Sequence, residues 1–148
     1  MSSYKNILIA LECSHNTEQV LAKGAEIKAL YPDASYSLVH VVLDVIIADW
    51  AGLPGQVPPA IDQQELAQAG ADYLKPLIEK SGLDENKLTV CFGSPAQAIL
   101  ELADSNNSDL IIAGSHSRRG LEILLGSTAH KILNLSKCDV LLVRTPKS

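Results

Sequence analysis

The residues with the clearest potential for chemistry form a stretch rich in glycine and hydroxyl groups in the last third of the chain. One part reads Gly114-Ser115-His116-Ser117-Arg118-Arg119-Gly120, and a second, Gly126-Ser127-Thr128, opens a helical pattern. Glycine lets a backbone come close to a ligand, and the free N–H groups at the start of a helix bind oxyanions. The pattern therefore predicts an anion site. The alternative is that the glycines only turn the chain and Ser127 only caps the helix.

The charge distribution favours a small local anion over a nucleic acid. Residues 1–113 hold 6 Lys against 15 Asp and Glu, a net charge of −9, whereas residues 114–148 hold 6 Lys and Arg against 2 Asp and Glu, a net charge of +4. Nucleic acid backbones are held by broad basic surfaces, and the pI of the whole chain is near 5.3. We expect no nucleic-acid partner.

The sequence lacks the motifs of several other common kinds of functional site. The region before Ser127 has no lysine for a Walker A loop, and no Gly-x-Gly-x-x-Gly follows the first apolar run. Without a Gly-x-Ser-x-Gly elbow, Ser115 and Ser117 are weak candidates for a nucleophile. The four histidines and Cys13 lack zinc-site spacing, and three cysteines without a Cys-x-x-Cys pair indicate a reducing compartment. The sequence thus assigns no catalytic residue and no metal ligand.

The elements that would position these residues alternate between short apolar runs and helical patterns. Five runs suit strands buried on both faces of a parallel sheet: 6–11, 36–42, 88–92, 110–113 and 140–143. Helical patterns cover about 16–31, 60–81, 95–104 and 126–135. The second helical pattern rests on apolar residues at Ile61, Leu66, Ala69, Tyr73, Leu74, Leu77 and Ile78. The predicted buried stripe of the last helix is Ala129, Ile132, Leu133 and Leu135. Residues 43–60 contain Trp50 and three prolines, and they predict an irregular apolar loop. This loop could cover the ligand, contact a partner subunit or pack on the core.

This alternation predicts one α/β domain over residues 1–148. We expect a doubly wound, five-stranded parallel sheet with helices on both faces. Ligands bind such sheets beyond the carboxyl ends of the strands, where the strand order reverses, so the loops after the first and fourth strands are the ones to search. No apolar run approaches the ~20 residues that span a bilayer, and no signal-peptide pattern opens the chain. We expect a soluble, cytoplasmic protein with no membrane partner.

Several segments together resemble the universal stress protein (UspA) family. They are residues 7–14, 38–41 and 109–116, together with Leu124-Leu125-Gly126-Ser127-Thr128 and the closing segment 138–144. The resemblance runs along nearly the whole chain and implies the doubly wound fold, a stress-response role and, in many members, binding of ATP or AMP, with Mg²⁺ as a further candidate.

The resemblance also implies which residues form the nucleotide site. The adenosine side would be lined by Ala10, Leu11, Glu12 and Val41. The ribose and phosphates would be surrounded by Ala113, Gly114, His116, Ser117, Gly126, Ser127 and Thr128. Arg118 is a further charge that could face the phosphates.

Three departures from the family pattern affect this site. Ser117 stands where the family has a second glycine, only eight residues separate it from Gly126 instead of nine, and Glu12 replaces the usual Asp. A side chain at Ser117 restricts close approach of the backbone, while Gly120 relaxes the shortened loop. Glu12 keeps the carboxylate and adds one methylene.

The last predicted strand indicates a dimer, and the sequence as a whole is compatible with three hypotheses about function. An apolar strand at the edge of a sheet invites pairing, so we expect a homodimer through Val140, Leu141, Leu142 and Val143. The leading hypothesis is a dimeric stress-response regulator that binds adenine nucleotide. The second is the same fold with a vestigial site, acting only through protein contacts. The third is a slow ATPase, for which only Glu12, Asp44 and His116 could serve as a base or magnesium ligand.

Overall fold

The computed structural model describes residues 3–14, 16–42, 62–115 and 127–144. Its strands are β1 (Asn6–Leu11), β2 (Ser35–Val42), β3 (Leu88–Phe92), β4 (Leu110–Gly114) and β5 (Asp139–Val143). Its helices are α1 (Thr17–Leu30), α3 (Gln63–Ser81), α4 (Pro95–Ser105) and α5 (Ser127–Leu135), with a short 3₁₀ helix, η1 (Glu85–Lys87). The predicted strands agree with these bounds to within one residue. The predicted Trp50 loop lies outside the described residues.

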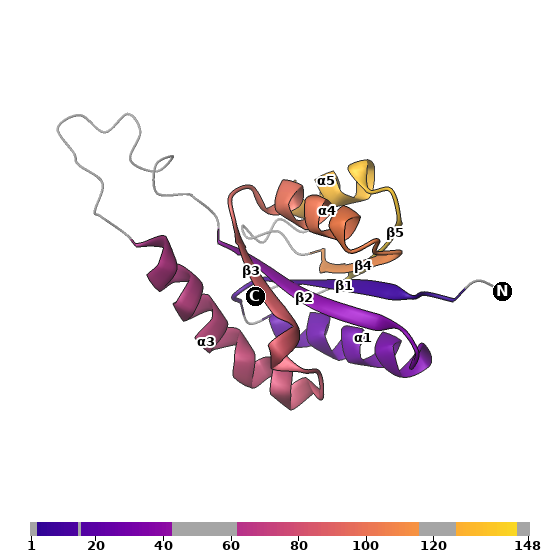
Figure 1. Ribbon diagram of the computed structural model, residues 1–148, viewed down its shortest axis with the longest axis horizontal. Helices are drawn as coiled ribbons and strands as arrows, with labels where there is room; N and C mark the ends of the chain where they lie inside the picture. Colours follow the sequence, from indigo (N-terminus) through magenta and orange to yellow (C-terminus); the bar gives the residue numbers. More distant parts are fainter. Residues whose placement is uncertain (1–2, 15, 43–61, 116–126, 145–148) are drawn as a thin grey trace.

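The five strands form one sheet in the order β3-β2-β1-β4-β5 (Figure 1). All four neighbouring pairs are parallel, which confirms the predicted doubly wound sheet. The chain starts in the middle with β1, proceeds outward to β2 and β3, and then crosses to β4 and β5. The strand order therefore reverses between β1 and β4, the two strands whose loops the sequence singled out.

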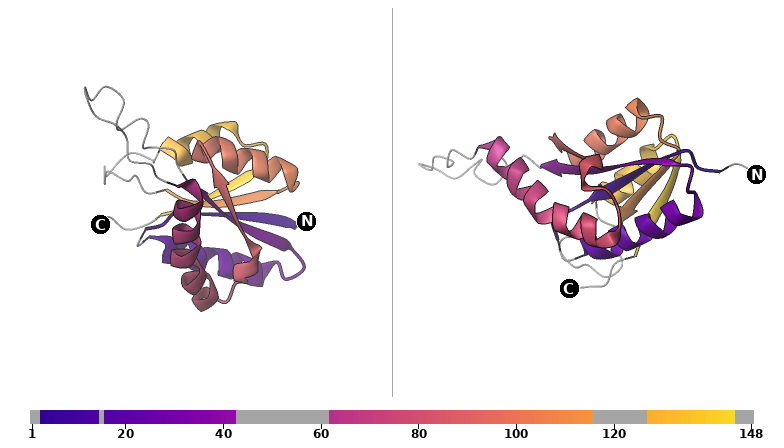
Figure 2. Two further views of the ribbon diagram at one scale, coloured as in Figure 1. Left: turned by 60° about the vertical axis from the view of Figure 1, so that its left-hand side comes forward. Right: turned by 60° about the horizontal axis from the view of Figure 1, so that its bottom comes forward.

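The helices cover both faces of the sheet. Figure 2 shows α1 and α3 on one face and α4 and α5 on the other. Alternate residues of β1 serve the two faces: Ile7, Ile9 and Leu11 pack with α1 and α3, whereas Leu8 and Ala10 pack with α4 and α5. This alternation is the two-residue period of a strand, and it explains why the central strand is apolar throughout.

The buried stripes of two helices are narrower than the sequence predicted. In α3 the buried positions are Gly70, Leu74 and Ile78; of the apolar pattern read from the sequence, Leu74 and Ile78 are therefore buried, whereas Ala69 and Tyr73 are exposed. Residues four apart lie on one side of a helix, so the positions one residue earlier are turned away from the sheet. Gly82, with a φ of 92°, ends this helix in the left-handed conformation that glycine favours.

The same correction applies to α5. Ala129 and Ile132 are buried as predicted, but the side chains of Leu133 and Leu135 are 49% and 66% exposed. The apolar positions of this helix therefore extend beyond the face that contacts the sheet.

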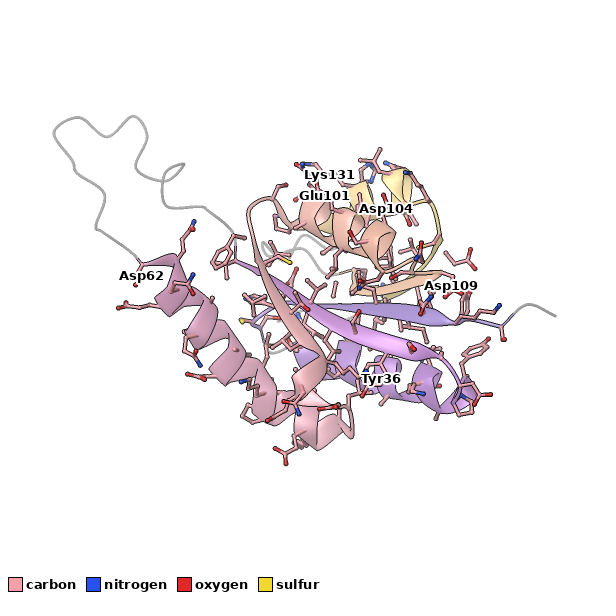
Figure 3. All side chains as sticks on the ribbon, in the orientation of Figure 1. Tyr36, Asp62, Glu101, Asp104, Asp109 and Lys131 are labelled. Carbon is pink, nitrogen blue, oxygen red and sulfur yellow. The ribbon has the colours of Figure 1, made fainter. Side chains whose placement is uncertain are left out.

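The amino-terminal edge of the sheet is fixed by the side chains of Asp109, just before β4, and Asp139, the first residue of β5. The carboxylate of Asp109, which Figure 3 shows beside the start of β1, accepts hydrogen bonds from the backbone N–H groups of Lys5 at 2.9 Å and Asn6 at 3.0 Å. The phenol of Tyr4 donates to Asp139 Oδ2 at 2.7 Å, and its ring packs edge-on against Tyr31. These contacts join the first strand to the last two at the edge opposite the predicted site.

The Tyr4 phenol should titrate well above the ordinary value for tyrosine. Its hydrogen bond to Asp139 favours the neutral form and, with burial, raises the pKa of Tyr4 from 10.0 to about 12. Because the folded pKa lies above the unfolded one, the contact stabilises the fold fully below pH 10.0, and this contribution is lost as the pH rises toward about 12. Phenolate absorbance, as the difference between wild type and Tyr4→Phe, measures this pKa. Asp139→Asn should return it toward 10.0; an unchanged value would contradict the assignment.

Candidate functional site

The carboxyl ends of β1 and β4 and the start of α5 supply the candidate site. Ala10 and Leu11 end β1 and Glu12 follows them, Ala113 and Gly114 end β4, and Ser127 and Thr128 open α5. Adjacent parallel strands end at the same edge of a sheet, so the reversal of strand order places the ends of β1 and β4 side by side. The strand ends and the helix start that carry these residues thus lie at the switch point of the sheet.

Small side chains line the α5 side of this edge. Ala10 and Ala113 are buried, and they pack on the same face of the sheet as Ile132 of α5. Val41 is half-buried on that face, whereas Leu11 is buried on the opposite face, against α1 and α3. Leu11 therefore differs from the other predicted adenosine-side residues: its side chain belongs to the opposite core, and only its backbone is available at this edge.

Glu12 combines a fixed backbone with an exposed side chain. Its carbonyl accepts hydrogen bonds from Ser14 N–H at 3.0 Å and from the Thr17 hydroxyl. Thr17, 2% exposed, sits at the first turn of α1 and holds this tight loop. The Glu12 side chain is exposed. A carboxylate held in this way can accept hydrogen bonds from the hydroxyl groups of a ligand.

The start of α5 provides a second kind of recognition. Ser127 is exposed and Thr128 is half-buried. The first N–H groups of a helix have no partner within it, and its dipole favours negative charge at this end. With their hydroxyls as added donors, these two residues can offer hydrogen bonds to an anion.

The remaining predicted residues, His116, Ser117 and Gly126, lie outside the described residues, as do Arg118 and Asp44. Their roles stay predictions from the sequence. Among the residues that the structure describes, no group of three or more His, Cys, Asp and Glu side chains could hold a metal ion.

Sequence reasoning missed one cluster at this edge. Cys13 Sγ lies 3.4 Å from His40 Nε2 and 3.9 Å from the carbonyl oxygen of Gly70. Burial, with a smaller contribution from the charge of Glu12, raises the pKa of the Cys13 thiol. One feature of the sequence could have indicated this cluster: glycine destabilises the interior of a helix, yet Gly70 lies in the middle of a strong helical pattern.

Parallel α/β proteins with polar loops at the switch point are a class that binds ligands at this edge. A family model described as "Universal stress protein family" matches residues 3–144. The chain therefore belongs to the universal stress protein family. It is 32% identical over 145 residues to universal stress protein A homolog 2 of Coxiella burnetii, covering 97% of each chain. It is 31% identical over 141 residues to homolog 1 of the same organism, covering 95% of this chain and 96% of the relative.

Solved structures share this fold. The structure of hypothetical protein MJ0577, solved for a structure-based assignment of its biochemical function, is 25% identical to this chain. The two superimpose with a TM-score of 0.74, over 99% of this chain and 100% of MJ0577. A universal stress protein solved in complex with cAMP is 21% identical, with a TM-score of 0.69 over 98% and 100%. At 21% identity, the similarity to the cAMP-bound protein is evidence for a shared fold. Within the described ranges, no helix has both the length and the apolar character needed to cross a membrane.

Proposed function

We propose that this universal stress protein binds an adenine nucleotide at the carboxyl edge of β1 and β4 and acts as a stress-response regulator. The observation that carries the proposal is the convergence at the switch point of two small buried residues, Ala10 and Ala113, with the exposed start of α5. Small side chains leave room beside the strand ends, and a helix start supplies donors for phosphate. The cAMP complex of a protein with the same fold supports a nucleotide as the ligand class.

The residues divide between the two ends of the nucleotide. On the adenosine side, Ala10, Val41 and the Leu11 backbone would contact the base, and the Glu12 carboxylate would accept hydrogen bonds from ribose hydroxyls. On the phosphate side, Gly114, Ser127 and Thr128 would present N–H and hydroxyl donors. The sequence adds His116, Ser117 and Gly126 to this second group.

Magnesium would enter this site mainly through the phosphates. Mg²⁺ keeps several waters and takes only one or two carboxylates alongside phosphate oxygens, so it needs no cage of protein ligands. Glu12 is a carboxylate of suitable exposure at this edge. Turnover would require a base near the phosphates as well. Three residues are candidates for that base: Glu12 lies in the described part of the chain, whereas Asp44 and His116 lie outside it. The proposal does not include hydrolysis of the nucleotide.

Nucleotide analysis of the purified protein tests the proposal. Denaturation should release AMP or ATP into the supernatant, and the emptied protein should bind added ATP and AMP with measurable heat in a calorimetric titration. A protein that is empty on release and silent in titration would mean a vestigial site, and the function would then lie in protein contacts.

The homodimer is a separate part of the proposal. β5 is an edge strand, and Val140, Leu141 and Leu142 are half-buried within one chain while Val143 is buried. An apolar edge of this kind exposes unpaired backbone groups, which a second copy of the same strand would satisfy. We therefore expect pairing of β5 with β5 in the dimer.

Leu142→Pro should weaken the dimer without breaking the sheet. Ser115 N–H donates to the Val143 carbonyl at 2.9 Å, so the backbone groups of Val143 face β4. Backbone groups of successive residues in a strand point to opposite edges, so the N–H of Leu142 faces the open edge, and proline removes it. Sedimentation equilibrium should show a dimer dissociation constant that is higher by roughly tenfold or more, because the interface loses about one to two backbone hydrogen bonds. Leu142→Ala, which keeps the N–H, is the control; equal dimerisation of the two variants would contradict pairing through β5.

A further inference from the structure

A thiol and an imidazole face each other beside the loop that follows β1. Cys13 Sγ and His40 Nε2 are 3.4 Å apart, within contact distance for a sulfur hydrogen bond. Cys13 comes from the loop, His40 from β2 and Gly70 from α3, so three separate elements build the cluster. Cys13 is an exposed residue, which leaves it accessible to a small reagent.

The other side of the His40 ring determines which nitrogen carries the proton. His40 Nδ1 lies 3.1 Å from the carbonyl oxygen of Leu11, and a carbonyl can only accept. Nδ1 must therefore carry hydrogen and donate, so in the neutral ring the lone pair of Nε2 is directed at the Cys13 thiol. A base held by a third group and aimed at a nucleophile is the arrangement that activates nucleophiles in general.

Gly70 makes room for this arrangement. A Cβ atom at position 70 would lie 2.9 Å from both Cδ2 and Nε2 of His40, and 3.6 Å from Cys13 Sγ. Any side chain there would push the ring away from its place. The glycine, which weakens a helix interior by roughly 0.5–1 kcal/mol, thereby permits the contact between the thiol and the imidazole.

The other two thiols of the chain provide an internal comparison. Cys91 and Cys138 are half-buried, and neither contacts a histidine among the described residues. Cys138 Sγ instead lies 3.4 Å from the Ser136 hydroxyl, and burial alone raises the pKa of Cys91. The raised pKa of Cys13 keeps its thiol protonated at neutral pH, so reaction there depends on a base that takes the proton.

We propose that Cys13 is a modification site, a thiol that His40 activates for oxidation by a peroxide. His40 Nε2 accepts the thiol proton, and the sulfur attacks one oxygen of hydrogen peroxide. The O–O bond breaks, the S–O bond forms, and the departing hydroxide takes the proton from the imidazolium to become water. The sulfur is oxidised to a sulfenic acid while the peroxide is reduced.

Site-resolved labelling of the full chain tests this proposal. The protein, free of nucleotide, is exposed to limiting hydrogen peroxide, sulfenic acids are trapped with a 1,3-dione, and the label on each cysteine is quantified by mass spectrometry. Cys13 should be labelled about tenfold faster than Cys91 or Cys138, given the contribution of a positioned base. Equal rates at the three cysteines would overturn the proposal, whatever the protein's affinity for nucleotide.

Variants separate base catalysis from simple exposure. His40→Asn retains a donor for the Leu11 carbonyl but removes Nε2, and Gly70→Ala displaces the ring. Each should slow labelling of Cys13 by about tenfold while Cys91 and Cys138 keep their rates. An unchanged Cys13 rate in His40→Asn would overturn the role of His40. If one variant unfolds, the rates at Cys91 and Cys138 will rise in it, and the other variant then decides.

Discussion

Replacing Ser127 by aspartate should abolish nucleotide binding at concentrations that saturate the wild type, without weakening the fold. Ser127 is the exposed first residue of α5, where we propose that phosphates bind. A carboxylate there repels the phosphates and blocks the helix N–H groups, which should raise the dissociation constant for ATP by roughly ten- to hundredfold. The same carboxylate interacts favourably with the helix dipole, adding about 0.3–1 kcal/mol to the stability of the helix. Calorimetric titration and thermal unfolding measure the two effects on one sample.

Ser127→Asn is the matched control. Asparagine is close in size to aspartate and also caps helices, but it carries no charge. It should retain most of the affinity for ATP. If the two variants bind equally, charge at this helix start does not matter, and the phosphates bind elsewhere. AMP should lose less affinity than ATP in the aspartate variant, because it carries less negative charge.

Ile132→Ala should cause the largest loss of stability among single substitutions in α5. The Ile132 side chain is fully buried between α5 and the sheet, packed with the cluster that holds Ala10 and Ala113. Removing its three outer carbons loses apolar burial and leaves a cavity, which costs roughly 2–5 kcal/mol of the free energy of unfolding. Urea denaturation, followed by circular dichroism, measures this loss as a lower midpoint with an unchanged slope.

Leu133→Ala is the neighbouring control for that change. Leu133 is 49% exposed, so truncation should cost under about 1 kcal/mol. Equal losses at the two positions would mean that α5 is rotated relative to the sheet. Since α5 also carries Ser127, Ile132→Ala should weaken nucleotide binding in proportion to how far it loosens the helix.

The strands were predictable because each is a short apolar run between polar turns, and a strand buried on both faces needs that composition. The sequence also indicated the two loops at the switch point, since β1 and β4 carry the polar continuations Glu12-Cys13-Ser14 and Gly114-Ser115. The faces of the helices were less predictable. Leu133 and Tyr73 fit an apolar period, but the sequence does not state how wide a stripe the sheet will cover, and both proved exposed.

The proposed site residues came from two sources, the anion motif and the family resemblance, and neither source reveals contacts between side chains. Ser127 was predicted from the anion motif, whereas Ala10 and Ala113 were predicted from the resemblance to the family; the structure brings the elements that carry these three residues to one edge of the sheet. The Cys13 and His40 contact was not, because it joins a loop, a neighbouring strand and a distant helix through tertiary packing. Leu11 is the last residue of β1, but the alternation of this strand turns its side chain into the core on the opposite face of the sheet.

The most direct test of the proposed site is a titration of the isotopically labelled protein with ATP, followed through its backbone amide resonances. The account predicts shifts concentrated at residues 10–12, 113–115 and 127–129, the ends of β1 and β4 and the start of α5. Residues 4–6, Asp109 and Asp139, at the opposite edge of the sheet, should stay unchanged. Shifts centred on that opposite edge, or no shifts at saturating ATP, would contradict nucleotide binding at the switch point.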